Sequence, residues 1–275
     1  MPHAIFSRMC KIRYALVTGA AGGMGRAVSR ALAADGWFVF ALDLTPRERE
    51  ENILPITADL TDEESVREAY AKVAAVTDRL DAVLHFAGTY MLDSLVEMES
   101  AAFDKILRVN LYSAYFVNKT FLPMMKNGTK VLMTTSELAP LDPLPFTGVY
   151  AVTKGALDKY AYSLRMELQL LGISVSVLRA GAVKTGMLGA SVAALDTFCE
   201  KTEHYRTGAK RFHDIVDRVE AKSVPPEAVA KKVRKILAKK HPAFAYSINR
   251  NPALRLLSLL PKRLQCAIIR KILKG

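Results

Sequence analysis

Short, continuously apolar runs alternate along the chain with longer segments in which apolar residues recur at helical spacing. A short apolar run bounded by turn residues predicts a buried strand, whereas recurrence every three to four residues predicts a helix. Strands are therefore predicted at 14–18, 37–42, 53–57, 81–86, 130–135 and 174–178, and helices at 26–34, 63–76, 103–125 and 150–171. Apolar strands that alternate with helices are typical of a parallel sheet covered on both faces. Since no linker or repeat divides the chain, we expect residues 1–275 to form one doubly wound α/β domain.

A glycine-rich segment, TGAAGGMG at 18–25, stands where the first predicted strand turns into a helix. Glycines there let bare backbone approach a pyrophosphate, and the helix N-terminus offers unpaired N–H groups to that anion. Asp43 follows the second strand, where a carboxylate accepts hydrogen bonds from ribose hydroxyls and repels a 2′-phosphate. The pattern predicts a Rossmann-type dinucleotide site that favours NAD. NADP stays an alternative, because Arg47 and Arg49 lie close behind and Asp43 could be a solvated acid at the strand end.

Tyr150 and Lys154 are four residues apart in a predicted helix, so they share one face. An ammonium beside a phenol favours the phenolate and lowers the tyrosine pKa, which suits general acid–base catalysis. This spacing alone is common by chance. Ser136, directly after the fifth predicted strand, adds a hydroxyl that could hydrogen-bond a developing alkoxide.

The glycine spacing T-G-x-x-x-G-x-G and the Y-x-x-x-K at 150–154 resemble the short-chain dehydrogenase/reductase family over residues 13–183. The resemblance implies that Tyr150 transfers a proton while Ser136 orients the substrate. It also implies that Lys154 lowers the tyrosine pKa and grips the ribose, and that Asn110 holds a water that relays the proton.

The same resemblance implies a set of cofactor contacts. They are Gly19, Ala21, Gly23, Met24, Gly25, Asp43, Asp59, Leu60, Ala87, Gly88, Tyr150, Lys154, Gly181, Val183 and Thr185. The sequence departs from the family pattern where His85 and Phe86 replace an asparagine pair, and where Ala180 replaces a proline. His85 is interpreted as a packed residue, with a catalytic base as the alternative.

By resemblance, residues 11–183 are the cofactor and catalytic core and residues 184–222 form a mobile lid, which shows no strong periodicity. Apolar lid residues suit a steroid-, retinoid- or acyl-like substrate, or they simply pack the lid. These residues are Met187, Leu188, Val192, Leu195, Phe198, Tyr205 and Phe212.

Residues 250–275 are a basic amphipathic tail that resembles tails of family members acting on steroids and retinoids. Apolar residues between 264 and 273 recur at helical spacing among lysines and arginines, which is typical of a helix lying in a membrane interface. The segment is too short and too charged to span a membrane. We expect the sheet and the site to be complete without this segment, which leaves it free for another role. The prediction is that residues 254–275 make peripheral contact with a membrane. A subunit contact or packing on the lid is the alternative.

The formal net charge of +12 is concentrated in the C-terminal quarter, where residues 206–275 hold 18 Lys and Arg against 4 Asp and Glu. No nucleic-acid-binding motif accompanies this charge, so no nucleic-acid partner is expected. Cys10, Cys199 and Cys266 are scattered, which fits a reducing compartment and gives no metal site. The first ten residues lack the features of a secretory signal. A cytoplasmic protein is expected, with peripheral membrane contact through its tail.

These observations predict an oxidoreductase that transfers hydride between NAD(H) and the alcohol or carbonyl group of a lipophilic substrate. The alternative is a catalytically silent, dinucleotide-sensing regulator or scaffold of the same fold. By resemblance, we expect a homodimer or homotetramer that assembles through the helices carrying Asn110 and Tyr150.

Overall fold

The computed structural model describes residues 12–274, apart from the side chains at 188, 190–192, 219 and 220. Within that range seven parallel strands form one sheet in the order β3-β2-β1-β4-β5-β6-β7. The strands are β1 Arg13–Thr18, β2 Trp37–Asp43, β3 Ile53–Thr57, β4 Leu80–His85, β5 Met125–Ser136, β6 Ser174–Ala180 and β7 Ala245–Ile248. The predictions about Cys10 and the first ten residues lie outside the described residues, as do residue 11 of the predicted core and Gly275 of the predicted tail.

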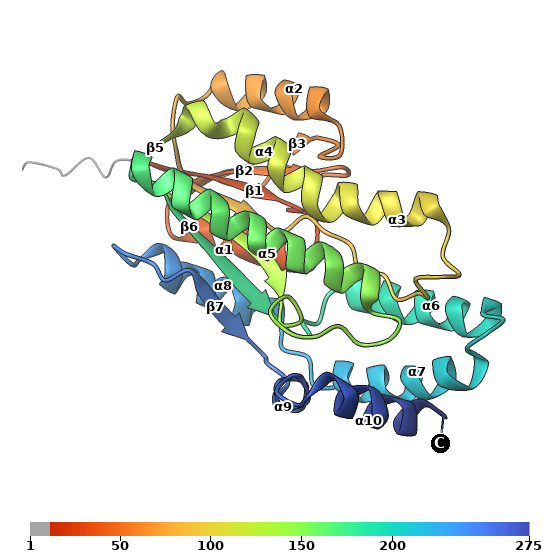
Figure 1. Cartoon of the computed structure of the whole chain (residues 1–275). Coiled ribbons are helices and arrows are strands. Elements are labelled where there is room, and N and C mark those ends of the chain that lie inside the picture. Colours follow the sequence, from red (N-terminus) through yellow and green to blue (C-terminus); the bar gives the residue numbers. More distant parts are fainter. Residues whose placement is uncertain (1–11, 275) are drawn as a thin grey trace, which may run out of the picture.

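Helices cover both faces of the sheet, as expected (Figure 1). Successive strand residues point to opposite faces, so each strand feeds two cores. Leu16 and Phe40 pack on one face with α2, α4 and α5, whereas Ala15 and Val39 pack on the other with α1 and α8. The helices are α1 Gly23–Ala34, α2 Glu63–Ala74, α3 Ser100–Leu107, α4 Ser113–Phe121, α5 Gly148–Leu168, α6 Gly186–Lys201, α7 Arg206–Glu220, α8 Pro226–Leu237, α9 Pro252–Ser258 and α10 Lys262–Lys274.

The single helix predicted at 103–125 is wrong, because a π-helical turn at Arg108–Tyr112 separates α3 from α4. Such turns occur frequently at functional sites, and this one carries Asn110. The helix also ends earlier, since β5 already begins at Met125 and pairs there with Leu80.

The C-terminal third contains more regular structure than the sequence predicted. The lid segment forms α6 and α7, and α7 buries Ala209, Phe212 and Val216 on one face, so it does have helical periodicity. β7 then pairs with β6 as a seventh strand. The six strands predicted from the sequence therefore lack this seventh one.

Candidate active site

The turn between β1 and α1 leaves no room for a side chain at three of its glycines, Gly19, Gly23 and Gly25. Gly19 has a φ of +65°, and a Cβ there would lie 2.5 Å from the Ala87 nitrogen. A Cβ at Gly23 would lie 2.6 Å from the methyl carbon of Thr185, and one at Gly25 would overlap the Gly19 carbonyl oxygen. No side chain caps the N-terminus of α1 within the described residues. Bare backbone and uncapped N–H groups together fit a dinucleotide pyrophosphate.

Asp43 ends β2 beside this turn, and its Oδ2 accepts a hydrogen bond from the Ala21 N–H at 2.9 Å. The carboxylate thereby ties the glycine-rich turn to the end of β2. Asp59 lies in the loop that follows β3, where its Oδ1 accepts hydrogen bonds from the Thr61 N–H at 2.9 Å and from the Thr61 hydroxyl at 2.7 Å. Leu60 is buried in the core beneath it. The ribose and adenine contacts assigned to these residues stay predictions.

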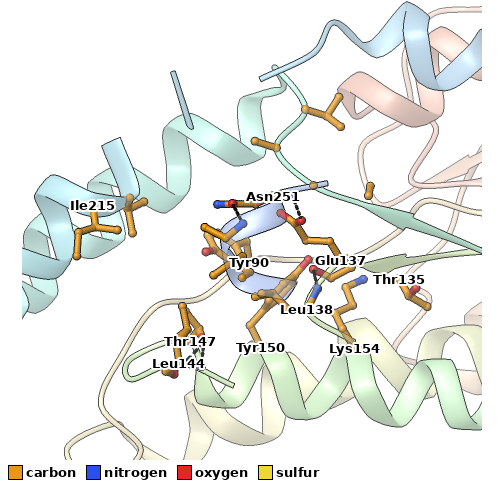
Figure 2. A pocket seen from close by; sticks show the side chains of 18 of the residues that line it. Tyr90, Thr135, Glu137, Leu138, Leu144, Thr147, Tyr150, Lys154, Ile215 and Asn251 are labelled. Atoms are coloured by element: carbon orange, nitrogen blue, oxygen red, sulfur yellow. Dashed lines mark hydrogen bonds between the residues drawn. The ribbon is translucent and has the colours of Figure 1, made fainter. Parts of the chain in front are cut away.

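Tyr150, Lys154 and Ser136 line one cavity, to which α5 contributes the first two side chains and the end of β5 the third. Figure 2 shows Tyr150 and Lys154 rising from α5 into the same space. The Tyr150 ring packs edge-on against Tyr90, with ring centroids 4.5 Å apart. Lys154 Nζ lies 5.8 Å from the centroid of the Tyr150 ring and donates to the Thr134 carbonyl at 3.3 Å. The sequence-predicted trio is thus brought together.

The electrostatics of the trio differ from the expectation. Burial raises the pKa of Tyr150 to about 12; a hydrogen bond with Ser136 opposes the rise, and the charge of Glu137 adds to it. Burial also lowers the pKa of Lys154 to about 8. The predicted lowering of the Tyr150 pKa by Lys154 is not found, because desolvation of the phenolate dominates. At neutral pH the phenol is therefore protonated and ready to donate.

Asn110 lies buried in the π-helical turn, and its side chain holds the loop that follows β4. Its Oδ1 accepts from the Thr89 N–H at 2.7 Å, and its Nδ2 donates to the Thr89 carbonyl and to Thr153 Oγ1, each at 3.0 Å. A Cβ at Gly88 in that loop would lie 3.2 Å from both Asn110 Oδ1 and Lys154 Nζ. This geometry positions the loop against Lys154. The water-relay role of Asn110 stays a prediction.

The residues that replace the family's asparagine pair have separate environments. His85 Nε2 lies 3.0 Å from Asn118 Oδ1, and burial lowers the pKa of His85 to about 4, so its ring is neutral at neutral pH. This buried pairing supports the packed interpretation over the catalytic one. Phe86 instead lines the cavity. The loop after β4 is nevertheless hydrogen-bonded to β1. The Phe86 N–H donates to the Thr18 carbonyl, and the Ala87 N–H donates to the Thr18 hydroxyl.

The loop after β6 joins the dinucleotide turn to the cavity. The Gly181 N–H donates to the Ile248 carbonyl at 3.0 Å, and a Cβ at Gly181 would overlap the Asn249 carbonyl oxygen. Glycine is therefore needed where this loop meets the end of β7. The sequence-predicted cofactor residues that line the same cavity as Ser136 are Met24, Gly88, Tyr150, Lys154, Gly181, Val183 and Thr185.

The cavity measures about 550 Å³ and has mostly apolar walls. Among the predicted lid residues, Met187 and Phe212 line it. Leu195 and Phe198 are instead buried in a cluster around Phe146, and the Tyr205 ring packs on Phe146 at a centroid distance of 5.4 Å. The side chains of Leu188 and Val192 lie outside the described part of the structure. Both interpretations of the lid residues therefore hold in part. Some of these residues line the cavity, and others pack the lid helices together.

The tail packs on the lid, which confirms one of the predicted alternatives, since Leu273 lies against the cluster of Phe198 and Phe212. It also forms a wall of the cavity, which was not expected. Both α9 and α10 contribute apolar residues, namely Leu254, Leu257, Ile268, Ile269, Ile272 and Leu273. Asp142 anchors them: it forms an ion pair with Lys262 and accepts a hydrogen bond from Gln265 Nε2 at 2.8 Å. The expectation that the site is complete without residues 254–275 is therefore wrong. Within the part of the chain that the structure describes, no helix is long and apolar enough to cross a membrane.

A parallel sheet with a glycine-rich turn at its first strand, and a tyrosine, a lysine and a serine at one cavity, define an oxidoreductase of the Rossmann class. Residues 13–196 match the family model of the short chain dehydrogenases, and the chain belongs to that family. The resemblance drawn from the sequence is confirmed.

Three similar proteins illustrate the match. The uncharacterized oxidoreductase YbbO of Escherichia coli (strain K12) is 30% identical over 94% of this chain and 93% of its own length. A 3-ketodihydrosphingosine reductase of Bacteroides thetaiotaomicron is 23% identical over 83% of this chain and 85% of its own. Among solved structures, a 3-ketoacyl-(acyl-carrier-protein) reductase from Brucella melitensis complexed with NADH has a TM-score of 0.69. It is 19% identical, and the match covers 86% of this chain and 96% of that one.

Proposed function

We propose that this chain is a nicotinamide-dependent alcohol dehydrogenase or ketoreductase with Tyr150 as its general acid/base. The observation that carries the proposal is the convergence of Tyr150, Lys154 and Ser136 on one cavity that the dinucleotide loops also line. A buried ammonium such as that of Lys154 is costly to fold, as its lowered pKa reflects. A silent dinucleotide sensor could use Lys154 to hold the ribose, but it would have no use for the Tyr150 and Ser136 hydroxyls beside it, so the complete trio favours catalysis over that alternative.

The chain's own groups suggest how the proton moves. Ser136 Oγ accepts a hydrogen bond from the Leu138 N–H at 3.2 Å, and its hydroxyl, which interacts with Tyr150 in this structure, can turn its proton to a substrate oxygen. In reduction the protonated Tyr150 donates to the carbonyl oxygen, and in oxidation its phenolate takes the alcohol proton. The charge of Lys154 favours that phenolate. When bound, the dinucleotide supplies the hydride donor or acceptor and, in its oxidised form, a positive charge.

For the cofactor we favour NAD, with NADP as the alternative. Asp43 places a carboxylate beside the glycine-rich turn, and a carboxylate there repels a 2′-phosphate. The NADH complex of the Brucella relative supports a nicotinamide dinucleotide in this fold. A parallel assay with NAD(H) and NADP(H) decides the preference, and an Asp43→Ser variant should relax it.

For the substrate we propose a lipophilic alcohol or ketone. The cavity of about 550 Å³ has apolar walls from the lid and the tail, and such walls hold aliphatic or polycyclic groups. The name of the Bacteroides relative, a 3-ketodihydrosphingosine reductase, adds support for a long-chain ketone.

The outer surface of the tail supports peripheral contact with an anionic membrane. Leu256 and Leu259 are 66% and 82% exposed, and Arg255 and Arg263 lie near them in the sequence. An apolar surface with neighbouring cations suits an anionic lipid interface. A Leu256→Glu/Leu259→Glu variant should lose flotation with anionic vesicles and keep its fold. Unchanged flotation, or none by the parent protein, would refute the membrane contact.

Assembly as a homodimer or homotetramer also stays a proposal. Tyr115 on α4, and Tyr162 and Met166 on α5, are exposed apolar residues that a second copy could cover. Sedimentation of the purified protein tests this, and a monomer at micromolar concentration would refute it.

Tyr150→Phe is the experiment that tests the reaction itself. The variant keeps the ring that packs on Tyr90 and removes only the hydroxyl. Dinucleotide binding by calorimetry should be unchanged, whereas turnover with long-chain and steroid alcohols and ketones should fall about 1,000-fold or more. Near-normal turnover by the variant would overturn the assignment of Tyr150.

A further inference from the structure

A carboxylate stands inside the apolar cavity next to the catalytic trio. Glu137 directly follows Ser136, and both line the cavity, because β5 ends at Ser136 and the strand alternation ends with it. The Glu137 N–H donates to the Ala180 carbonyl at 3.0 Å, which fixes its backbone against the end of β6. Figure 2 shows the Glu137 side chain between Asn251 and the residues that rise from α5.

This carboxylate is only partly satisfied by the protein. Glu137 Oε2 accepts a hydrogen bond from the Asn251 N–H at 2.6 Å. Among the described residues, no hydrogen bond reaches Oε1 and no cation lies within 4.0 Å of the carboxylate. Arg250 acts on it only through its longer-range charge. One oxygen of a partly desolvated anion is therefore available inside the cavity.

The environment makes that oxygen a strong acceptor. Burial raises the pKa of Glu137, while the Asn251 hydrogen bond and the charge of Arg250 oppose the rise. A partly buried carboxylate gains most from a donor that also carries positive charge, because charge-assisted hydrogen bonds are about twice as strong as neutral ones. Glu137 is also the sole acidic residue among the described side chains that line the cavity.

The position of Glu137 limits where the partner group lies on the substrate. Adjacent residues have Cα atoms about 3.8 Å apart, so Glu137 and Ser136 address neighbouring parts of one molecule. The charge of Glu137 also reaches the Tyr150 hydroxyl strongly enough to raise its pKa. A cationic group held by Glu137 would thus lie within a few bonds of the reacting carbon, while the apolar walls hold a chain beyond it.

We propose that Glu137 is a specificity-determining residue that binds an ammonium group of the substrate close to the reacting carbon. The substrate class is then a long-chain amino alcohol or the corresponding amino ketone. This inference rests on the proposed function and narrows it. It assigns to Glu137 a substrate contact in addition to its hydrogen bond with Asn251.

The test compares two long-chain alcohols that differ only by an amino group on the carbon next to the alcohol carbon. Oxidation of each with NAD is followed at neutral pH for the parent protein and for Glu137→Gln. Glutamine keeps an acceptor for the Asn251 N–H and loses only the charge. Glu51→Gln, an exposed position, is the control.

The parent protein should prefer the amino alcohol, and Glu137→Gln should reduce its kcat/KM for that substrate about 10- to 100-fold while leaving the plain alcohol nearly unchanged. Loss of a merely structural contact would lower both values together. Calorimetry with a long-chain alkylammonium should show the same loss of affinity without any turnover.

Two results would overturn the inference in distinguishable ways. Turnover of both alcohols without preference, or a preference that survives in Glu137→Gln, refutes the ammonium contact and leaves the proposed function intact. No turnover of the two alcohols, or of their ketones with NADH, refutes the inference; if steroid alcohols and ketones are not turned over either, the proposed function is refuted with it. If Glu137→Gln does not fold, the preference of the parent protein decides alone.

Discussion

Replacing Lys154 by methionine should make the protein more stable while it abolishes catalysis. Lys154 is 5% exposed, and burial lowers its pKa from the ordinary 10.5 to about 8. Each pKa unit corresponds to about 1.4 kcal/mol, so the charged lysine costs the folded state about 3 kcal/mol at neutral pH. Methionine fills a similar volume without the charge. Loss of the hydrogen bond to the Thr134 carbonyl destabilises the variant by about 1 kcal/mol. On balance, the free energy of unfolding should rise by about 2 kcal/mol.

The sign of the pH dependence follows from the direction of the shift. Because the folded pKa of Lys154 is depressed, the unfolded chain binds more protons between about pH 8 and 10.5, and the stability of the parent protein rises over that window. At pH 10 the cost of the charge falls to about 1 kcal/mol, which is close to the value of the lost hydrogen bond. The advantage of Lys154→Met should therefore be full below pH 8 and almost absent at pH 10.

The measurement is thermal unfolding of the parent protein and of Lys154→Met, without dinucleotide, at pH 7 and pH 10. A gain of 2 kcal/mol corresponds to about 4–8 °C in Tm for a chain of this size. Lys159→Met is the matched control, because Lys159 is exposed on the same helix and its replacement should change Tm little at either pH. A Lys154→Met protein that is no more stable at pH 7, or whose advantage persists at pH 10, would refute the desolvation argument.

Two further substitutions test the buried histidine and the glycine-rich turn. Since burial lowers the pKa of His85 from 6.5 to about 4, the parent protein should lose about 2–3 kcal/mol of stability as the pH falls from 7 to 4.5. His85→Asn should lack this loss in urea unfolding, and an equal loss would contradict it. Gly25→Ala places a Cβ on a carbonyl oxygen of the turn, so stability should fall by about 1–3 kcal/mol and dinucleotide affinity at least 10-fold. Gly186→Ala, whose Cβ would meet nothing within 4 Å, is the control, and equal calorimetric affinities for the two variants would exclude a steric role for Gly25.

Local patterns were enough to predict the sheet core and the grouping of Ser136, Tyr150 and Lys154 at one site. Residues 14–17 of β1 and 37–42 of β2 are continuously apolar because helices cover both faces of the sheet there. Tyr150 and Lys154 could be paired because helical spacing alone puts them on one face. These features depend on residues close in sequence, where periodicity is informative.

Features that depend on distant contacts could not be predicted in this way. The π-helical turn at Arg108–Tyr112 interrupts a pattern that otherwise reads as one helix. The raised pKa of Tyr150 reflects burial, which spacing does not reveal. Glu137 has no motif, and its environment exists only because Asn251 lies against it in the fold. The amphipathic pattern of α10 predicts one apolar face and allows packing on the lid, which the contact of Leu273 with the lid cluster confirms, but it does not predict that this face also walls the cavity.

The tie between Asp142 and the tail has a consequence for the order in which the protein folds. Asp142 forms hydrogen bonds with Ser258 and Gln265, which lie 116 and 123 positions further along the sequence. The hydrogen bond between Glu137 and Asn251 joins residues that are 114 positions apart. Closing such long loops is entropically costly, so contacts of this kind form late in folding and belong to the segments that open most easily. We expect the amides of α9 and α10 to exchange with deuterium well before those of β1 and β4. The nascent protein would then complete its dinucleotide turn first and acquire its substrate chamber last.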